Sequence, residues 1–125
     1  MSLHPEHTYV HLAPDGKAEE LDGAGFWRLP PDQFAHYGKG WVISEYAYNH
    51  DWPNWEMHPE GDEFVYLLSG AVELLLERGG EIVTTKLDGS GAVVVPRGVW
   101  HTAKVRQPSR VLHVTRGAGT QSRPA

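Results

Sequence analysis

Two segments that lie far apart in the chain carry the side chains best suited to chemistry. The first contains Glu56, His58 and Glu63, and the second ends in His101. Successive side chains of a β-strand point to opposite faces, so Glu56 and His58 share one face. Glu63 begins the next predicted strand, and antiparallel pairing would bring it opposite His58. We therefore expect two imidazoles and one or two carboxylates on the inner face of a small barrel.

These donors are typical of a metal centre. Two histidines and a carboxylate with open coordination positions suit non-haem Fe(II), and the same donors also bind Mn, Ni, Co and Zn. The chain contains no cysteine, which excludes thiolate ligands, disulfides and iron–sulfur clusters. No serine or cysteine nucleophile stands in a recognisable motif, so the sequence also argues against acyl-enzyme chemistry.

The elements that must position these residues are short strands. Fourteen glycines and nine prolines divide the 125 residues into pieces rich in β-branched and aromatic side chains. Strands of this kind, with turn residues between them, predict an all-β sandwich or barrel. The predicted strands cover residues 41–48, 63–69, 71–78, 82–87, 92–96, 100–105 and 110–116, with hairpin turns at Gly70 and at residues 78–81.

The two ends of the chain carry weaker signals. Residues 9–12 and 26–29 are candidate strands, and residues 30–37 are the one candidate helix, with Asp32 as its candidate cap. Residues 117–125 have almost no apolar surface to bury, so we predict a flexible tail there. The predicted organisation is one domain over residues 1–116.

The two chemistry-bearing segments resemble the two motifs of the cupin superfamily. In this sequence four residues separate the last histidine of the first motif from its glutamate, and six separate that glutamate from a glycine. The second motif, proline-x-glycine-x-x-histidine, is matched without a gap. The resemblance covers residues 52–105 and implies a double-stranded β-helix, that is, a jelly-roll barrel. The matching residues are His58, Glu63 and Gly70 in the first motif and Pro96, Gly98 and His101 in the second.

The sequence departs from the cupin motifs at three positions. Glu56 replaces the usual first histidine, Ser90 stands where a glycine usually opens the second motif, and Val105 replaces a final asparagine. Because glutamate binds the same metals, the resemblance implies a divalent transition metal (Fe, Mn, Ni, Co or Zn) held by Glu56, His58, Glu63 and His101. Two alternatives stay open: Glu56 accepts a hydrogen bond beside the metal, or the barrel holds a polar cluster and no metal.

Other polar and aromatic residues are candidates for the surroundings of the site. A barrel of this size keeps a pocket at its mouth, lined by aromatic side chains and a few polar groups. We expect solvated side chains at Glu60, Asp62 and Arg97, with an anchor for an anionic substrate as the alternative role of Arg97. His4, His7 and His11 are expected at the surface. The candidate lining residues are Tyr46, Tyr48, Trp100 and His113.

The function class follows from the expected metal. We predict a metal-dependent enzyme of dioxygenase, isomerase or lyase type that acts on a small organic substrate in the barrel. The alternative is a non-catalytic cupin that binds or senses a small ligand, with or without metal. A third hypothesis, a metal-free isomerase or epimerase, needs a histidine–carboxylate base and a tyrosine acid, a set that the sequence does not locate.

Charge and hydropathy narrow the range of partners. The net charge of −5 and the pI near 5.9 argue against nucleic acid. No apolar run is long enough to cross a membrane, and the first residues lack a secretion signal, so a cytoplasmic location is expected. We expect a homodimer with residues 9–12 at or near its interface, because small barrels leave exposed strand edges.

Overall fold

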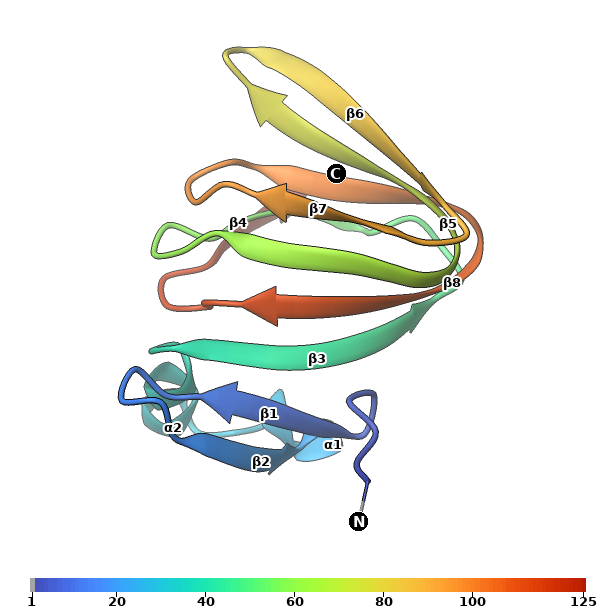
Figure 1. The fold of residues 1–125 in the computed structure, drawn as a ribbon. Coiled ribbons are helices and arrows are strands. Elements are labelled where there is room, and N and C mark those ends of the chain that lie inside the picture. The colour runs from blue at the N-terminus through green and yellow to red at the C-terminus, as the bar shows by residue number, and fades with distance from the viewer. Residues whose placement is uncertain (1) are drawn as a thin grey trace.

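The computed structural model describes residues 2–125, which form one antiparallel sheet of nine strands and two short helices (Figure 1). The helices are α1 (Gly23–Phe26) and α2 (Pro31–Tyr37). The strands are β1 (Thr8–Leu12), β2 (Ala18–Asp22), β3 (Trp41–Tyr48), β4 (Asn54–Met57), β5 (Glu63–Arg78), β6 (Glu81–Asp88), β7 (Gly91–Val95), β8 (His101–Thr115) and β9 (Gln121–Pro124). The prediction of an all-β fold is confirmed.

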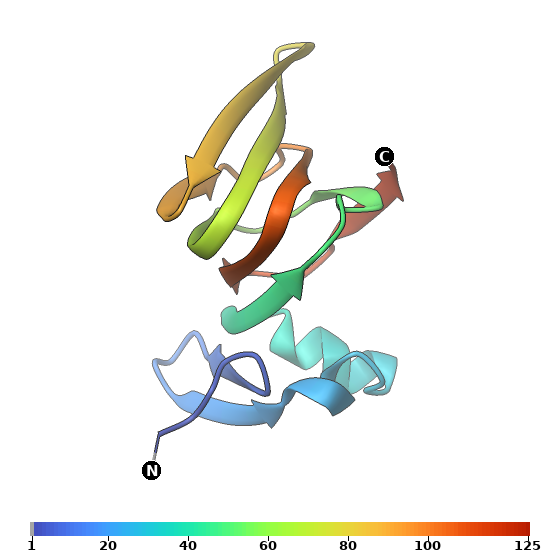
Figure 2. The ribbon, with the colours of Figure 1, turned by 90° about the vertical axis from the view of Figure 1, so that its right-hand side faces the viewer.

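The long strands β5 and β8 hold the sheet together. One path of neighbours runs β2-β1-β3-β8-β4-β9, and β5 pairs with β6, β7 and β8 (Figure 1). The end of β8 pairs with β3 and with the start of β5, whereas the start of β8 pairs with β4 and with the second half of β5. The sheet therefore curls on itself, as the turned view shows (Figure 2). Its inner side chains pack against one another in the core.

Strand β5 corrects the prediction of a hairpin at Gly70. The strand continues through this glycine, and the register with β8 shifts between Leu67 and Val72. Gly70 has φ +99°, and a Cβ there would overlap the side chain of Ser109. Ser109 in turn accepts a hydrogen bond from the Ala71 amide at 3.0 Å. The glycine thus permits a bulge and a close approach of two strands rather than a turn.

The same correction applies to β8, where two strands were predicted and one is found. Its residues 107–109 lie opposite the bulge of β5, so both long strands bend at the same place. By contrast, the turn predicted at residues 78–81 is present. Gly79 and Gly80 have φ +59° and +81° and connect β5 to β6 through the closing pair Arg78 and Glu81.

The main core lies between the facing sheet layers. Alternate residues of β5 point inward, so Val65, Leu67 and Leu74 have no exposed surface, and Val111 of β8 packs with them. A second, smaller cluster joins the N-terminal segment to the barrel through Tyr9, Phe26 and Val42. The N-terminal segment is therefore packed onto the edge of the barrel.

The N-terminal segment differs from the sequence prediction in two details. Residues 23–26 form helix α1, where a strand over 26–29 was expected, because the Asp22 side chain accepts a hydrogen bond from the Gly25 amide at 3.2 Å and caps the turn. Helix α2 is present, but Pro30 precedes it and Asp32 lies inside its first turn, so Asp32 is not its cap.

Strand β9 lies where the sequence predicted a flexible tail over residues 117–125. It pairs with β4 through the whole of residues 121–124. Arg123 adds an ion pair with Glu77, and its guanidinium lies 4.3 Å from the ring centre of Trp100. Backbone pairing, which composition does not reveal, orders this segment. Among residues 2–125, no helix is long and apolar enough to span a membrane.

Candidate metal centre

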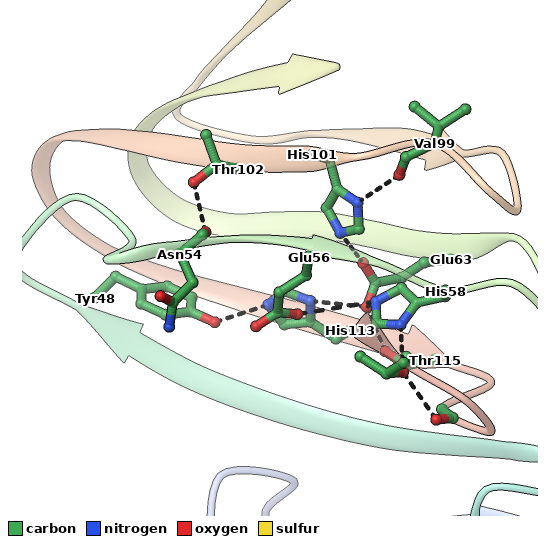
Figure 3. Close-up of polar contacts among 12 residues, drawn as sticks. Tyr48, Asn54, Glu56, His58, Glu63, Val99, His101, Thr102, His113 and Thr115 are labelled. Carbon is green, nitrogen blue, oxygen red and sulfur yellow. Dashed lines mark hydrogen bonds and ion pairs between the residues drawn. The ribbon is translucent and has the colours of Figure 1, made fainter. Parts of the chain in front are cut away.

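Four polar side chains converge on the inner side of the sheet (Figure 3). Glu56 lies on β4, His58 follows that strand directly, Glu63 is the first residue of β5, and His101 is the first residue of β8. Glu56 and His101 are register partners between β4 and β8. Ligand atoms of Glu56, His58 and His101 lie within 4.8 Å of one another. The structure therefore brings these residues together from three strand ends.

Glu63 lies at the centre of the group and is 3% exposed. Its Oε1 is 3.1 Å from Nε2 of His101, and its Oε2 is 3.5 Å from Nε2 of His58. Oε2 also accepts a hydrogen bond from the Thr115 hydroxyl. Burial by itself would raise the pKa of Glu63, but contacts with His101, His113 and His58 hold it well below its usual range. Glu63 is therefore a carboxylate.

The proton of His58 is placed by two hydrogen bonds. Nδ1 of His58 lies 2.8 Å from Oγ1 of Thr120, and the Thr120 hydroxyl lies 2.8 Å from the carbonyl oxygen of Gly117. The carbonyl only accepts, so the hydroxyl proton goes to Gly117 and Nδ1 of His58 must donate to Thr120. In the neutral ring Nε2 then carries a lone pair. This Nε2 is buried and has no hydrogen-bond partner.

His101 is held in the same way. Its Nδ1 donates to the carbonyl oxygen of Val99 at 3.1 Å. Its Nε2, 3.1 Å from Oε1 of Glu63, donates to that carboxylate when the ring is protonated and carries the lone pair when the ring is neutral. Burial would lower the pKa of His101, but the carboxylate of Glu63 outweighs burial and raises it. Without a metal, a proton on Nε2 of His101 therefore lies between this ring and Glu63, and loss of that proton leaves two imidazole nitrogens facing two carboxylates. A divalent metal can take the place of this proton, so the residues fit such a metal.

A second chain of contacts leads away from Glu63. His113 of β8 is 5% exposed, and its Nδ1 lies 3.5 Å from Oε2 of Glu63. Its Nε2 lies 3.1 Å from the hydroxyl of Tyr48 on β3. Burial raises the pKa of Tyr48, so this hydroxyl stays protonated. When Nδ1 of His113 donates to the Glu63 carboxylate, Nε2 of the neutral ring accepts the hydrogen bond of the Tyr48 hydroxyl. Tyr48, His113 and Glu63 therefore form a connected line at the site (Figure 3).

A cavity of about 1110 Å³ opens beside these residues. Tyr46 and Tyr48 of β3, Glu56 of β4 and His113 of β8 all face it, together with His58 and Glu63. Tyr46 and Tyr48 lie two residues apart on β3, so the alternation of the strand directs both to the same side. The site is thus at the inner end of an open cavity.

Solved structures share this fold, although the sequence matches no protein-family model and no curated protein. A cupin-2 domain protein from Shewanella frigidimarina superposes with a TM-score of 0.52 at 15% identity, over 60% of this chain and 69% of that chain. Hydroquinone 1,2-dioxygenase from Sphingomonas sp. TTNP3, with 4-hydroxybenzoate bound, has a TM-score of 0.51 at 19% identity, over 66% and 64%. Fe(II) HppE in complex with its substrate has a TM-score of 0.52 at 15% identity, over 60% and 42%.

The chain has the cupin fold. The resemblance found in the two sequence motifs is thereby confirmed at the level of the fold, and so is the jelly-roll architecture. The match covers 64% of the dioxygenase chain and 42% of the HppE chain.

Two predictions about individual side chains, Trp100 and His11, are wrong. Trp100 was expected in the pocket, but it does not line the cavity. It precedes the inward-facing His101, so strand alternation turns it to the other face, where Arg123 covers it. His11 was expected at the surface, yet it is 2% exposed and its Nε2 lies 2.5 Å from the Lys39 carbonyl oxygen. Strand β1 is paired on both edges, which buries His11.

The remaining polar candidates lie away from the cupin centre. Glu60 is exposed, and Asp62 accepts a hydrogen bond from the backbone amide of Arg97 at 2.8 Å. Arg97 itself is exposed and does not face the cavity. Asp62 therefore fastens the turn of the second motif, and Arg97 is not placed to anchor a substrate.

Sequence reasoning missed several residues of the site. Thr115 and Thr120 orient Glu63 and His58, but a lone threonine near a chain end carries no signal. Phe26 of α1, Trp27 directly after it, and Phe34 and Tyr37 of α2 also line the cavity. The dense run of aromatic residues between 26 and 37 was the one available signal for them.

Proposed function

We propose that this cupin binds a divalent transition metal through Glu56, His58, Glu63 and His101 and acts as a metal-dependent enzyme on a small organic substrate. The observation that carries the proposal is the buried, unpartnered Nε2 of His58, whose lone pair faces carboxylates. Nitrogen and oxygen donors of this kind suit Fe, Mn, Ni, Co and Zn.

Each residue has a role that follows from its contacts. When bound, the metal supplies Lewis-acid polarisation of a substrate oxygen or, as Fe(II), access to oxygen chemistry. Thr120 and Val99 hold the two imidazoles with Nε2 directed inward, and Thr115 holds Glu63. Glu56 is the most exposed of the four and borders the cavity, so substrate approaches the centre on its side.

Proteins of the same fold support this choice. One of them is a dioxygenase, and another is an Fe(II) protein in complex with its substrate. The cavity beside the centre is large enough for a small organic molecule, which a purely structural metal would not require.

Metal content of the purified protein tests the proposal. We expect about one metal per chain in the wild type and loss of most of it in His58→Ala and in His101→Ala. His7→Ala is the matched control, because His7 is exposed and lies outside the cavity. Equal metal in His58→Ala and the wild type would overturn the site. Metal binding without turnover of any small-molecule substrate class would favour a sensing function.

A second candidate function rests on the line from Tyr48 through His113 to Glu63. A neutral phenol hydrogen-bonded to an imidazole, with a carboxylate behind it, is the acid–base set that a metal-free isomerase requires. This function predicts turnover that survives a chelator and is lost in Tyr48→Phe. The metal-dependent function predicts loss of turnover with the chelator.

A further inference from the structure

An unbroken series of aromatic rings runs along one wall of the cavity. Trp27 of the α1 end contacts Phe34 of α2 at 5.9 Å between ring centres and Tyr46 of β3 at 6.5 Å. Tyr46 contacts Tyr48 at 5.9 Å, and Tyr48 contacts Trp52 at 5.4 Å. All five rings line the cavity. This aromatic wall leads from the N-terminal helices to the metal centre.

The outer end of the wall is left open to water. Trp27 is 60% exposed and Phe34 is 37% exposed, although the two rings touch. Adjacent large apolar side chains on the wall of a cavity mark a place where a ligand covers them. Rings of this kind favour another planar ring, because offset and edge-to-face aromatic pairs are more stable than area burial alone accounts for.

The charges of the cavity exclude an anionic ligand. Among the lining residues, all within the described part of the chain, Lys39 is the one cationic side chain, and no arginine is present. Glu56 in place of a histidine gives the centre two carboxylates, which together cancel the charge of a divalent metal. A carboxylate or phosphate ligand would therefore find no net positive charge at the inner end.

Two of the three carboxylates that line the cavity are engaged at its inner end and are not free for a cationic ligand. Glu63 contacts His58, His101 and Thr115. Asp51 accepts a hydrogen bond from the amide of Val105 at 2.7 Å, and Glu56 belongs to the proposed ligand set. An aromatic cage binds an ammonium group most tightly when an unpaired negative charge lies beside the rings. Among the described lining residues, Asp51 is the one carboxylate outside the proposed ligand set, and its Oδ1 is turned to the Val105 amide.

We infer that the cavity takes a neutral aromatic molecule of phenol type, with its ring on the aromatic wall and its hydroxyl toward Glu56 and His58. The placement of the hydroxyl rests on the proposed function, whereas the placement of the ring rests on the aromatic wall alone. A phenol is neutral at physiological pH, because its pKa is about 10. Its apolar ring and single polar group match the apolar wall and the polar inner end of the cavity.

Binding of four probes to the wild-type protein, measured by calorimetry, tests this ligand class. The probes are phenol, cyclohexanol, benzoate and benzyltrimethylammonium, which vary the ring and the charge separately. We expect phenol to bind about tenfold more tightly than each of the others, the scale of one aromatic contact. Equal or tighter binding of benzoate, of the ammonium compound or of cyclohexanol overturns the inference. This comparison requires no variant to fold.

Two phenylalanines of matched exposure locate the binding surface. Phe34 on the aromatic wall is 37% exposed, and Phe64 on the outer face of β5 is 39% exposed and outside the cavity. We expect Phe34→Ala and Trp27→Ala to weaken phenol binding about tenfold, and Phe64→Ala to leave it unchanged. Equal losses in Phe34→Ala and Phe64→Ala would show nonspecific binding and overturn the inference.

The His58→Ala variant separates this inference from the proposed function. We expect it to lose metal and to keep phenol binding within a few-fold, because the ring contacts remain. Stoichiometric metal in the wild type with no preference for phenol overturns the ligand class and leaves the metal centre standing. Selective phenol binding by a wild-type protein that holds no metal overturns the proposed metal centre and supports the ligand class.

Discussion

Thr120 decides which nitrogen of His58 carries the proton. Its Oγ1 lies 2.8 Å from Nδ1 of His58 and gives its own proton to the carbonyl of Gly117. A residue next to β9 thereby turns the lone pair of His58 toward Glu63, on the far side of the ring. The residue would therefore act on the proposed metal centre without contacting the metal.

Removing this hydroxyl should weaken the centre without removing a ligand. We expect Thr120→Val to lower metal affinity about 10- to 100-fold, the range found when partners of metal ligands are changed. Thr120→Ser keeps the hydroxyl and should bind nearly as the wild type does. Competition titration against a chelator of known affinity measures both. Equal affinities for the valine and serine variants would show that Thr120 does not orient His58.

Glu56 should be less important than the two histidines. Glu56→Gln keeps the volume and leaves His58, Glu63 and His101, so we expect retained metal at an affinity reduced about 10- to 100-fold or somewhat more. Glu56→His should hold Zn, Ni or Cu at least as tightly as the parent, because imidazole suits these ions. Metal analysis of both variants beside His58→Ala checks the order. If Glu56→Gln loses all metal while His58→Ala keeps it, the centre lies elsewhere.

The metal-free protein should be most stable at mildly acidic pH. The lowered pKa of Glu63 contributes stability above its unfolded value of about 4.3, and this is lost as the pH falls through the folded value. The raised pKa of His101 contributes stability below its unfolded value of about 6.5, and this is lost as the pH rises through the folded value.

Thermal unfolding in the presence of a chelator, from about pH 5.5 to about pH 9, measures this dependence across the range in which histidine titrates. We expect the Tm of the wild type to fall toward alkaline pH more steeply than that of His101→Gln, whose amide can donate to Glu63 but does not titrate. Parallel curves would contradict a charged His101. Metal binding should depend on pH in the opposite direction. Protons compete with the metal for the imidazoles, so metal should be lost as the pH falls from about 7 to about 5.

Gly70 should be far less replaceable than Gly79. Both have positive φ, but a Cβ at Gly70 would overlap Ser109, whereas a Cβ at Gly79 meets nothing within 4 Å. We expect Gly79→Ala to cost about 1–2 kcal/mol in unfolding free energy, the left-handed penalty, and Gly70→Ala more than about 3 kcal/mol, since steric overlap adds to it. Urea unfolding measures both. Equal costs would mean that β5 and β8 separate easily at the bulge.

We also expect a homodimer in solution, with residues 9–12 at or near its interface. Strand β1 is paired with β2 and β3, so it offers no free edge, and β2 is the outer strand of this end of the sheet. Light scattering at micromolar concentration should give twice the mass of 13.9 kDa. A clean monomer mass would contradict the expectation.

The sequence by itself determined the strand content, the turn at residues 78–81 and the two motifs that bear His58, Glu63 and His101. These features depend on local properties, namely the alternation of side chains along a strand, the freedom of paired glycines and the spacing of donors. The same local signals were misleading at Gly70. A glycine with positive φ serves a turn and a bulge alike, and the choice depends on the partner strand.

Only the tertiary structure decided how the donors are protonated and what surrounds them. The contact that orients His58 joins residues 62 positions apart, and the one between Tyr48 and His113 joins residues 65 apart. Trp27 reaches the cavity because the N-terminal segment packs on β3. Side-chain type and spacing do not encode such meetings, since they arise from the path of the whole chain around the barrel.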